Sequence, residues 1–310
     1  MPTVLTLAQA AARINDEIGR GIVQTVVKMN PLYNILPYTP FSGQSLTVTP
    51  VDQEGNVEAI DVGDIITADA PTTYDSKTFF PTTLIGKINM NGLVQVTSIG
   101  AGDNELTAQI AQKARNIGMQ FQQHIATGTG IHPSLHSLRS LAAGSQTVDG
   151  EGAAISFEML DELADKVRSK GRQCDAFVMP TSCVRQVKAL LRASGGTSMV
   201  DLNGVMVEAV DGIPVLRNDY LSVSELADGT EDAMGDKTSI YAVNFDDGTR
   251  TTGISAIYPA ASLNMGFNVT YTGEDPNYDN EVYKIKQYVG FANFADLGLA
   301  RVRNVSPKAV

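Results

Sequence analysis

A long polar segment between two strands is the feature that most limits how this chain can fold. The segment from residue 40 to residue 85 begins with the alternating strand Ser45-Leu46-Thr47-Val48-Thr49 and returns with a strand near Thr78 to Ile88. Roughly thirty polar residues separate the strands, and a hairpin of that length is not a compact domain. Few of its residues are large and apolar, so burial within the segment cannot offset the entropy lost on ordering it. We therefore predict a long hairpin that is either mobile or ordered by a partner.

The hairpin is acidic, and a later segment is basic. Seven acids and one base, Lys77, give the hairpin a charge of −6; the acids are Asp52, Glu54, Glu58, Asp61, Asp64, Asp69 and Asp75. Between residues 166 and 192 seven bases and one acid, Asp175, give +6; the bases are Lys166, Arg168, Lys170, Arg172, Arg185, Lys188 and Arg192. Opposite charges on separate elements predict that the two contact each other, within one molecule or between neighbouring copies. The alternative is two solvated faces, because exposed ion pairs contribute only ~0–1 kcal/mol each.

The composition predicts a globular chain that does not read DNA sequences. The 310 residues are 43% hydrophobic and 18% charged, which is enough apolar material for a folded core. The net charge of −11 opposes contact with a phosphate backbone. A sequence-specific DNA-binding protein is therefore excluded.

The sequence also shows no membrane span and no secretory signal. No apolar run reaches the ~20 residues that a transmembrane helix needs, and the N-terminus lacks a basic region followed by an apolar one. Two cysteines, Cys174 and Cys183, are too few for a disulfide framework, so we expect both to be reduced. We expect a soluble protein made in the cytosol.

Helices and strands follow from hydrophobic spacing. A stripe from Thr6 to Met29 predicts a helix that ends at Pro31 and packs on another surface as an arm, or else an ordinary first helix. We expect a strand from Leu93 to Ile99 and then a helix of about 24 residues capped by Asp103. Its apolar stripe is Leu106, Ile110, Ala114, Ile117, Phe121 and Ile125.

The second half of the chain reads as a mixed α/β lobe followed by strands. A helix capped by Ser156, a strand at 176–179 and a helix capped by Thr181 come first. Asp211-Gly212 marks a hairpin. Further strands are expected at 239–245, 253–258, 268–272, 282–291 and 299–305.

Possible chemical sites are weak, and we predict no catalytic residue, no cofactor and no metal. Gly100-Ala101-Gly102 before a helix resembles part of a dinucleotide site, but Asp103 and Glu105 stand where a phosphate would lie. His132 and His136 are four apart, yet Pro133 between them indicates a loop. Cys183 lacks a nearby histidine. The acids from Glu274 to Glu281 lack the order of a calcium loop.

The order of these elements resembles the major capsid proteins of tailed double-stranded-DNA bacteriophages, which have the HK97-like fold. The segments that carry the resemblance are Pro31–Pro37, Ser76–Phe80 into Leu93–Val96, the helix from Asn104 with Thr127–Gly130 and Leu138 behind it, and Cys174–Pro180. They span most of the chain, and the resemblance depends on their order and lengths.

The resemblance implies an α+β architecture and a division of the chain. It implies an N-terminal arm (1–36), an extended E-loop hairpin (37–92), a P-domain (93–150) with a spine helix (104–127), an α/β A-domain (151–274), and C-terminal strands that return to the P-domain (275–310). The hydrophobic stripe of the arm and the polar composition of the hairpin also indicate that both need a partner surface.

The resemblance also implies a function. The chain would be a structural, non-enzymatic head protein that self-assembles into the pentamers and hexamers of an icosahedral shell around phage double-stranded DNA. It would be found in the virion, after assembly in the host bacterial cytoplasm. The alternatives are an encapsulin-like nanocompartment shell of the same fold and a soluble enzyme with a site around Cys183.

The implied partners are copies of the chain itself. Only some forty residues precede the hairpin, so the resemblance implies a separate scaffolding protein or none, with a portal and possibly a decoration protein. DNA would be enclosed without sequence-specific binding, and no membrane would be involved. We expect the hairpin acids to contact basic residues of an adjacent copy; the residues concerned are Asp52, Glu54, Glu58, Asp61, Asp64, Asp69, Lys166, Arg168, Lys170 and Arg172.

Overall fold

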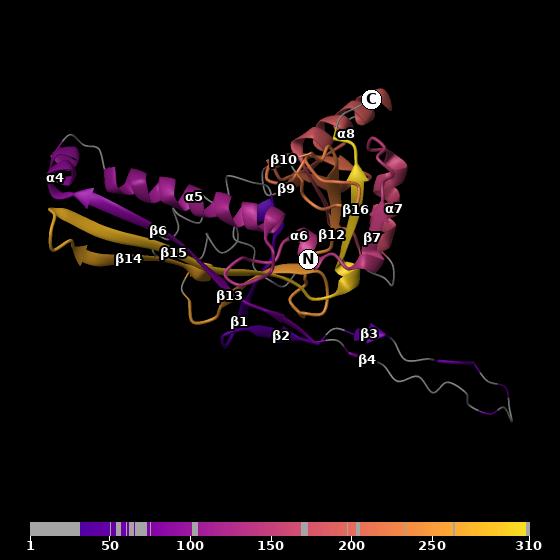
Figure 1. The fold of residues 1–310 in the computed structure, drawn as a ribbon, viewed down its shortest axis with the longest axis horizontal. Coiled ribbons are helices and arrows are strands. Elements are labelled where there is room, and N and C mark those ends of the chain that lie inside the picture. Colours follow the sequence, from indigo (N-terminus) through magenta and orange to yellow (C-terminus); the bar gives the residue numbers. More distant parts are fainter. Residues whose placement is uncertain are drawn as a thin grey trace.

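Two β-sheets and one long helix organise the chain (Figure 1). The structure is a computed structural model that describes residues 32–49, 51–53, 57–59, 61, 65, 73–74, 76–100, 105–168, 173–196, 198–202, 205–232, 234–262 and 264–307. The arm helix expected at 6–29 lies outside these residues.

The first sheet has five strands built around one long strand, β15. Its order is β1 (Tyr38–Phe41), β13 (Ile254–Pro259), β15 (Asn280–Asn293) and β14 (Phe267–Glu274), and β6 (Thr82–Asn91) also pairs with β15. The first ten residues of β15 pair with β6 in antiparallel register, and its last four pair with β13. The sheet therefore narrows into a long tongue of β6, β14 and β15, seen on the left of Figure 1.

The helix α5 (Glu105–Thr127) runs along this tongue and confirms the predicted long helix. Its stripe at Ile110, Ala114, Ile117, Phe121 and Ile125 is buried in a core shared with the sheet. That burial is the main force that fixes the helix there, because helix propensity alone is weak.

The chain enters this core through the short helix α3 (Leu32–Ile35). Tyr33 is fully buried and stacks on Phe121, with ring centroids 6.0 Å apart. Its hydroxyl donates a hydrogen bond of 2.5 Å to the backbone oxygen of Gly118. Tyr33 therefore holds α3 against α5.

The second sheet has seven strands and confirms the mixed α/β lobe. Its order is β7 (Thr147–Asp149), β16 (Leu299–Val305), β12 (Thr238–Val243), β8 (Ala176–Met179), β11 (Ile213–Arg217), β10 (Val205–Val210) and β9 (Ser198–Leu202). The pairs β7–β16 and β8–β11 are parallel, and the other pairs are antiparallel.

Two helices cover one face of this sheet. Phe177 and Met179 of β8 face a core that includes α7 (Phe157–Arg168) and α8 (Thr181–Ala193). Ala176 and Val178 face the core of the first sheet. Because side chains alternate along a strand, β8 joins the two cores and is apolar throughout. The helix α7 packs on β16 and β12, whereas α8 packs on β11.

The remaining elements are short. The hairpin contains β2 (Leu46–Val48) paired with β5 (Lys77–Phe79), and β3 (Val51–Gln53) paired with β4 (Thr73–Tyr74). The others are α4 (Gly92–Gly100), α6 (Leu138–Leu141) and the 3₁₀ turns η1 (Gly144–Gln146), η3 (Asn264–Gly266) and η4 (Asp296–Gly298).

The structure corrects two sequence predictions about local elements. The segment from Leu93 to Ile99 is the helix α4 and not a strand. The backbone N–H of Leu93 donates a hydrogen bond of 3.1 Å to the side-chain oxygen of Asn91, so Asn91 is the N-cap of this helix. The apolar alternation of Leu-Val-Gln-Val had indicated a strand instead. In α8 the N-cap is Pro180, and the predicted cap Thr181 instead donates its hydroxyl hydrogen to Asp219.

The two sheets are also interleaved along the chain. β7 and β16 belong to the seven-stranded sheet, whereas β13 and β14 belong to the five-stranded one. The expected boundaries at residues 150 and 274 therefore do not coincide with the boundaries between the sheets. Strand order within a sheet is set by long-range pairing, which spacing along a sequence does not reveal.

Candidate subunit interfaces

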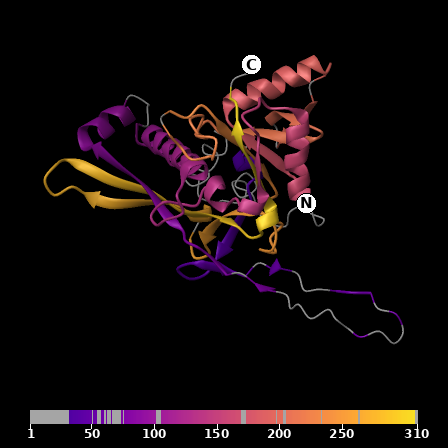
Figure 2. The same ribbon diagram turned by 45° about the vertical axis from the view of Figure 1, so that its right-hand side comes forward.

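The hairpin leaves the body of the molecule through a packed base. Phe79 of β5 is buried, with its ring centroid 6.4 Å from that of Phe294 and 5.5 Å from that of His136. Lys77 forms an ion pair with Asp296 in η4. Beyond this base, β3 and β4 lie outside the outline of both sheets in the two views (Figures 1 and 2).

The described part of the hairpin exposes apolar and acidic side chains. Val57 and Ile65 are 93% and 84% exposed. Glu58 and Asp61 are exposed as well, and Asp52 lies in β3. The predicted contact residues Glu54, Asp64 and Asp69 lie outside the described residues, as do Lys170 and Arg172 of the basic segment.

The described part of the hairpin lies apart from the bases at the end of α7. Lys166 and Arg168 end α7, which is separated from β3 and β4 in both views. A contact between the described hairpin strands and these bases would therefore need a second copy, and it stays a prediction.

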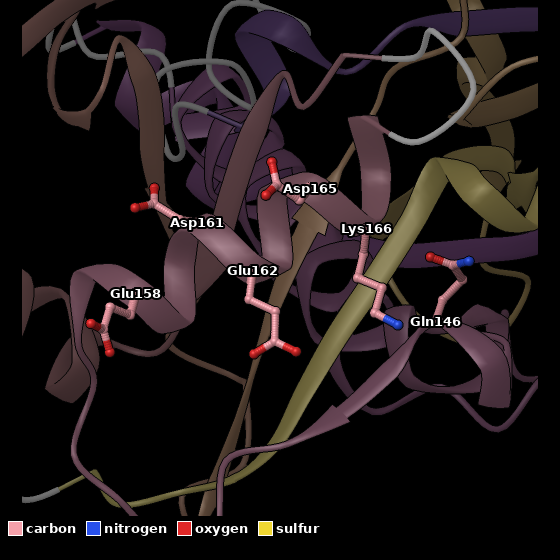
Figure 3. A pocket seen from close by; sticks show the side chains of 6 residues that line it. All are labelled: Gln146, Glu158, Asp161, Glu162, Asp165 and Lys166. Atoms are coloured by element: carbon pink, nitrogen blue, oxygen red, sulfur yellow. The ribbon is translucent and has the colours of Figure 1, made fainter.

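The outer face of α7 carries a set of acids that the sequence analysis missed. Figure 3 shows four carboxylates along this helix and Lys166 pointing toward Gln146 on η1. They line an open hollow of about 630 Å³. All four are exposed, and within the described part of the chain none is in an ion pair; they are Glu158, Asp161, Glu162 and Asp165. Their spacing of three and four residues, opposite the buried stripe, was the signal available in the sequence.

The outer face of α8 is basic. Lys188 pairs with Glu208 of β10 at 2.5 Å, so one of the predicted bases is neutralised within the chain. Arg185 and Arg192 are exposed, and neither is in an ion pair among the residues that the structure describes.

The tip of the tongue is apolar. Leu93, Val94 and Val96 of α4 are 69%, 47% and 70% exposed, and the helix carries no charged residue. The backbone N–H of Gly92 donates to the oxygen of Asp279 at 3.0 Å, and a Cβ at Gly92 would lie 2.7 Å from the Asp279 carboxylate. The turn between β14 and β15 thus holds α4 in place while its apolar side chains face solvent.

The residues considered as possible chemical sites pack against other side chains, are buried as thiols, or lie at a helix terminus. His136 packs against Phe79, and no group of three His, Cys, Asp or Glu side chains in the described residues is placed to hold a metal ion. Cys174 and Cys183 are buried, and burial raises the pKa of each thiol to about 12, so both are protonated near neutral pH. Glu105 lies in the first turn of α5. None of the described helices is long and apolar enough to cross a membrane.

Comparison with known proteins shows a likeness of structure without a likeness of sequence. No family model and no curated protein matches the chain. The holo-SrpI encapsulin complex from Synechococcus elongatus PCC 7942 is similar with a TM-score of 0.69 at 16% identity, over 90% of this chain and 88% of that one. The capsid of a native GTA particle has a TM-score of 0.61 at 12% identity, over 91% of each chain. The chain has the HK97-like capsid fold.

Bacteriophage structures share the HK97-like fold with this chain. The structure of Microbacterium phage Oxtober96 has a TM-score of 0.56 at 12% identity, over 86% of this chain and 88% of that one. The predicted α+β architecture with a hairpin, a spine helix and an α/β lobe is thereby confirmed. In this fold, the hairpin strands β3 and β4 and the apolar tip at α4 project away from the two sheets (Figure 1).

Proposed function

We propose that this chain is a major capsid protein that assembles with copies of itself into pentamers and hexamers of an icosahedral shell. The observation that carries the proposal is the hairpin, whose described strands β3 and β4 pair with each other beyond the body and are not hydrogen-bonded strands of either large sheet. A two-stranded hairpin is marginally stable by itself, and another copy would supply the missing surface. The exposed apolar tip of α4 supports the same conclusion, because such patches commonly mark protein–protein contacts.

We propose that the shell encloses phage double-stranded DNA and is part of the virion, assembled in the host bacterial cytoplasm. The net charge of −11 supports a container that does not adsorb its contents strongly. A separate scaffolding protein, a portal and a decoration protein are the partners proposed with it. The role is structural and not enzymatic.

We also propose the division into arm, E-loop, P-domain and A-domain, with its boundaries modified by the strand pairing. The five-stranded sheet with α5 corresponds to the P-domain, and the seven-stranded sheet with α7 and α8 corresponds to the A-domain.

An encapsulin-like shell is the second candidate, favoured by the TM-score of 0.69 with the SrpI encapsulin complex. The two candidates differ in cargo. Particles purified from the natural source should contain double-stranded DNA if the chain is a phage head protein, and a protein if it is an encapsulin.

Negative-stain microscopy of the expressed chain tests the shared part of the proposal. Closed shells or isolated rings of five and six copies are expected, with or without a co-expressed scaffolding protein. A single monodisperse species of one or two copies under all these conditions would contradict it.

A further inference from the structure

The two helices that cover the seven-stranded sheet carry opposite charges on their outer faces. The acidic face of α7 is formed by Glu158, Asp161, Glu162 and Asp165, and the basic face of α8 by Arg185, Lys188 and Arg192. Both sets lie outside the shared core, and among the described residues only Lys188 of the two sets forms an ion pair within the lobe.

The faces lie at different flanks of the lobe. The helix α7 covers β16 and β12, next to the edge strand β7, and α8 covers β11, on the side of the other edge strand β9. Figure 1 shows α8 at the top of the lobe and α7 along its right-hand side. In a head-to-tail ring every copy presents one flank to the preceding copy and a different flank to the next. A ring of these lobes can therefore place α7 of one copy beside α8 of another.

Shape and composition of the two flanks support the same pairing. The α7 flank is hollowed, with the four carboxylates along the hollow (Figure 3). The flank of α8 ends in β9 and β10, where Met199 and Met206 are 51% and 60% exposed. An interface with an apolar centre and a charged rim needs both kinds of surface.

We propose that in each ring the acidic face of α7 contacts the basic face of α8 of the next copy. The partner is a second copy of this chain, and the inference rests on the proposed function. The guanidinium groups of Arg185 and Arg192 lie against the hollow beside α7 of the next copy, where they meet carboxylates that form no ion pair with the described residues of their own chain. Complementary charges of this kind set the register of a contact and reject wrong orientations.

Two charge-reversal variants test the contact. The first, Asp161→Lys with Glu162→Lys and Asp165→Lys, leaves Glu158 to favour the N-terminus of α7. The second is Arg185→Glu with Arg192→Glu, and it retains the Lys188–Glu208 pair. Each variant alone places like charges across every ring contact, so its critical concentration for assembly should rise roughly tenfold or more.

A mixture of the two variants gives the sharpest result. Opposite charges then face each other only where the variants alternate, which is possible around a ring of six but not around a ring of five. Native mass spectrometry with one variant isotopically labelled should show six-membered rings with three copies of each variant, and closed shells should be absent because they require pentamers.

Controls separate this inference from the proposed function. A control with Asp232→Lys and Asp236→Lys changes exposed carboxylates in the loop between β11 and β12 and should assemble as the original does. Circular dichroism should show that all variants are folded. If the unaltered chain forms no rings or shells, the proposed function fails. If the unaltered chain assembles and either reversed variant alone assembles equally well, or if the folded mixture forms no alternating rings, the α7–α8 contact is wrong.

Discussion

The guanidinium of Arg301 lies 3.2 Å from the carboxylate of Glu225, and both side chains are almost fully buried. Arg301 on β16 also donates to the hydroxyl of Ser239 at 2.9 Å and to the backbone oxygen of Gly229 at 2.9 Å. The pair thus joins the loop between β11 and β12 to the seven-stranded sheet.

Removing one partner of this pair should destabilise the subunit strongly. Arg301→Met leaves the Glu225 carboxylate buried without its counter-charge, which typically costs about 3–5 kcal/mol. Urea unfolding of the unassembled subunit measures the change. The control is Arg303→Met, since Arg303 and Asp149 form a half-exposed pair that is worth about 0–1 kcal/mol. Equal losses of unfolding free energy for the two variants would show that the buried Arg301 pair contributes no more to stability than the half-exposed pair.

Gly128 should not tolerate a side chain. A Cβ at this position would lie 2.2 Å from the backbone oxygen of Leu135 and 2.6 Å from that of His124. Backbone atoms cannot move aside cheaply, so Gly128→Ala should lower the free energy of unfolding by about 1–3 kcal/mol or more. A Cβ at Gly144 would meet nothing within 4 Å, and Gly144→Ala should leave stability unchanged or slightly raised. Calorimetry on both variants makes the comparison, and a stable Gly128→Ala protein would contradict the packing described here.

The pH dependence of stability should carry a contribution from Asp246. This side chain is fully buried and accepts a hydrogen bond from the backbone N–H of Arg250 at 3.1 Å. Burial raises its pKa above the ordinary 3.8. The folded state therefore favours the protonated carboxyl, and the stability that this group contributes is fully present below pH 3.8 and is lost as the pH rises through the folded pKa.

Asp246→Asn tests this directly, because asparagine retains an acceptor and cannot ionise. The variant should match the original at pH values near 3.8 and become the more stable of the two as the pH rises toward 7. Urea unfolding across this range gives the difference between the two proteins. Curves that stay parallel would exclude Asp246 as a source of pH dependence.

The predicted contact between the hairpin and the basic segment has its own test. Asp61→Lys with Asp64→Lys should block shell formation, and adding Arg168→Glu with Lys170→Glu should partly restore it, because the charges are again opposite. Light scattering at low salt follows assembly. Normal assembly of the two-lysine variant at low salt would refute this pairing without affecting the α7–α8 contact.

The apolar tip should matter for assembly and not for folding. Leu93→Ser with Val96→Ser changes side chains that are mostly exposed, so the melting temperature of the unassembled subunit should hardly change. If the tip is buried between copies, shells of this variant should dissociate at lower urea concentration than the original. Unchanged shells would show that α4 stays exposed in the assembly.

Local patterns predicted most of the elements but not how they are arranged. The stripe from Ile110 to Ile125 predicted α5, and the apolar run at Ala176–Met179 predicted β8. Both signals are strong because α5 buries one continuous stripe and β8 buries both of its faces. The strand prediction for Leu93–Ile99 was wrong because the apolar alternation of this segment suits a strand equally well. The helix depends on its cap Asn91 and on a contact with Asp279, almost two hundred residues away.

The sequence indicated only some of the charged surfaces, for a similar physical reason. The bases were counted as a run along the chain, so the acids from Glu158 to Asp165 just before the run were not included. On a helix those acids and the buried Leu160 and Leu163 lie on opposite faces, and only the folded lobe shows that they form a surface. The spacing of residues in one sequence does not reveal which surfaces of two copies contact each other.

The position of β16 has a consequence for synthesis on the ribosome. This strand lies between β7 and β12 and supports α7, yet it is the last strand of the described chain. While the nascent chain is still short of residue 305, β12 has an open edge and α7 lacks one of the two strands on which it packs. Unfinished polypeptides therefore cannot present a complete α7 flank, and this surface forms only after the final strand has been translated.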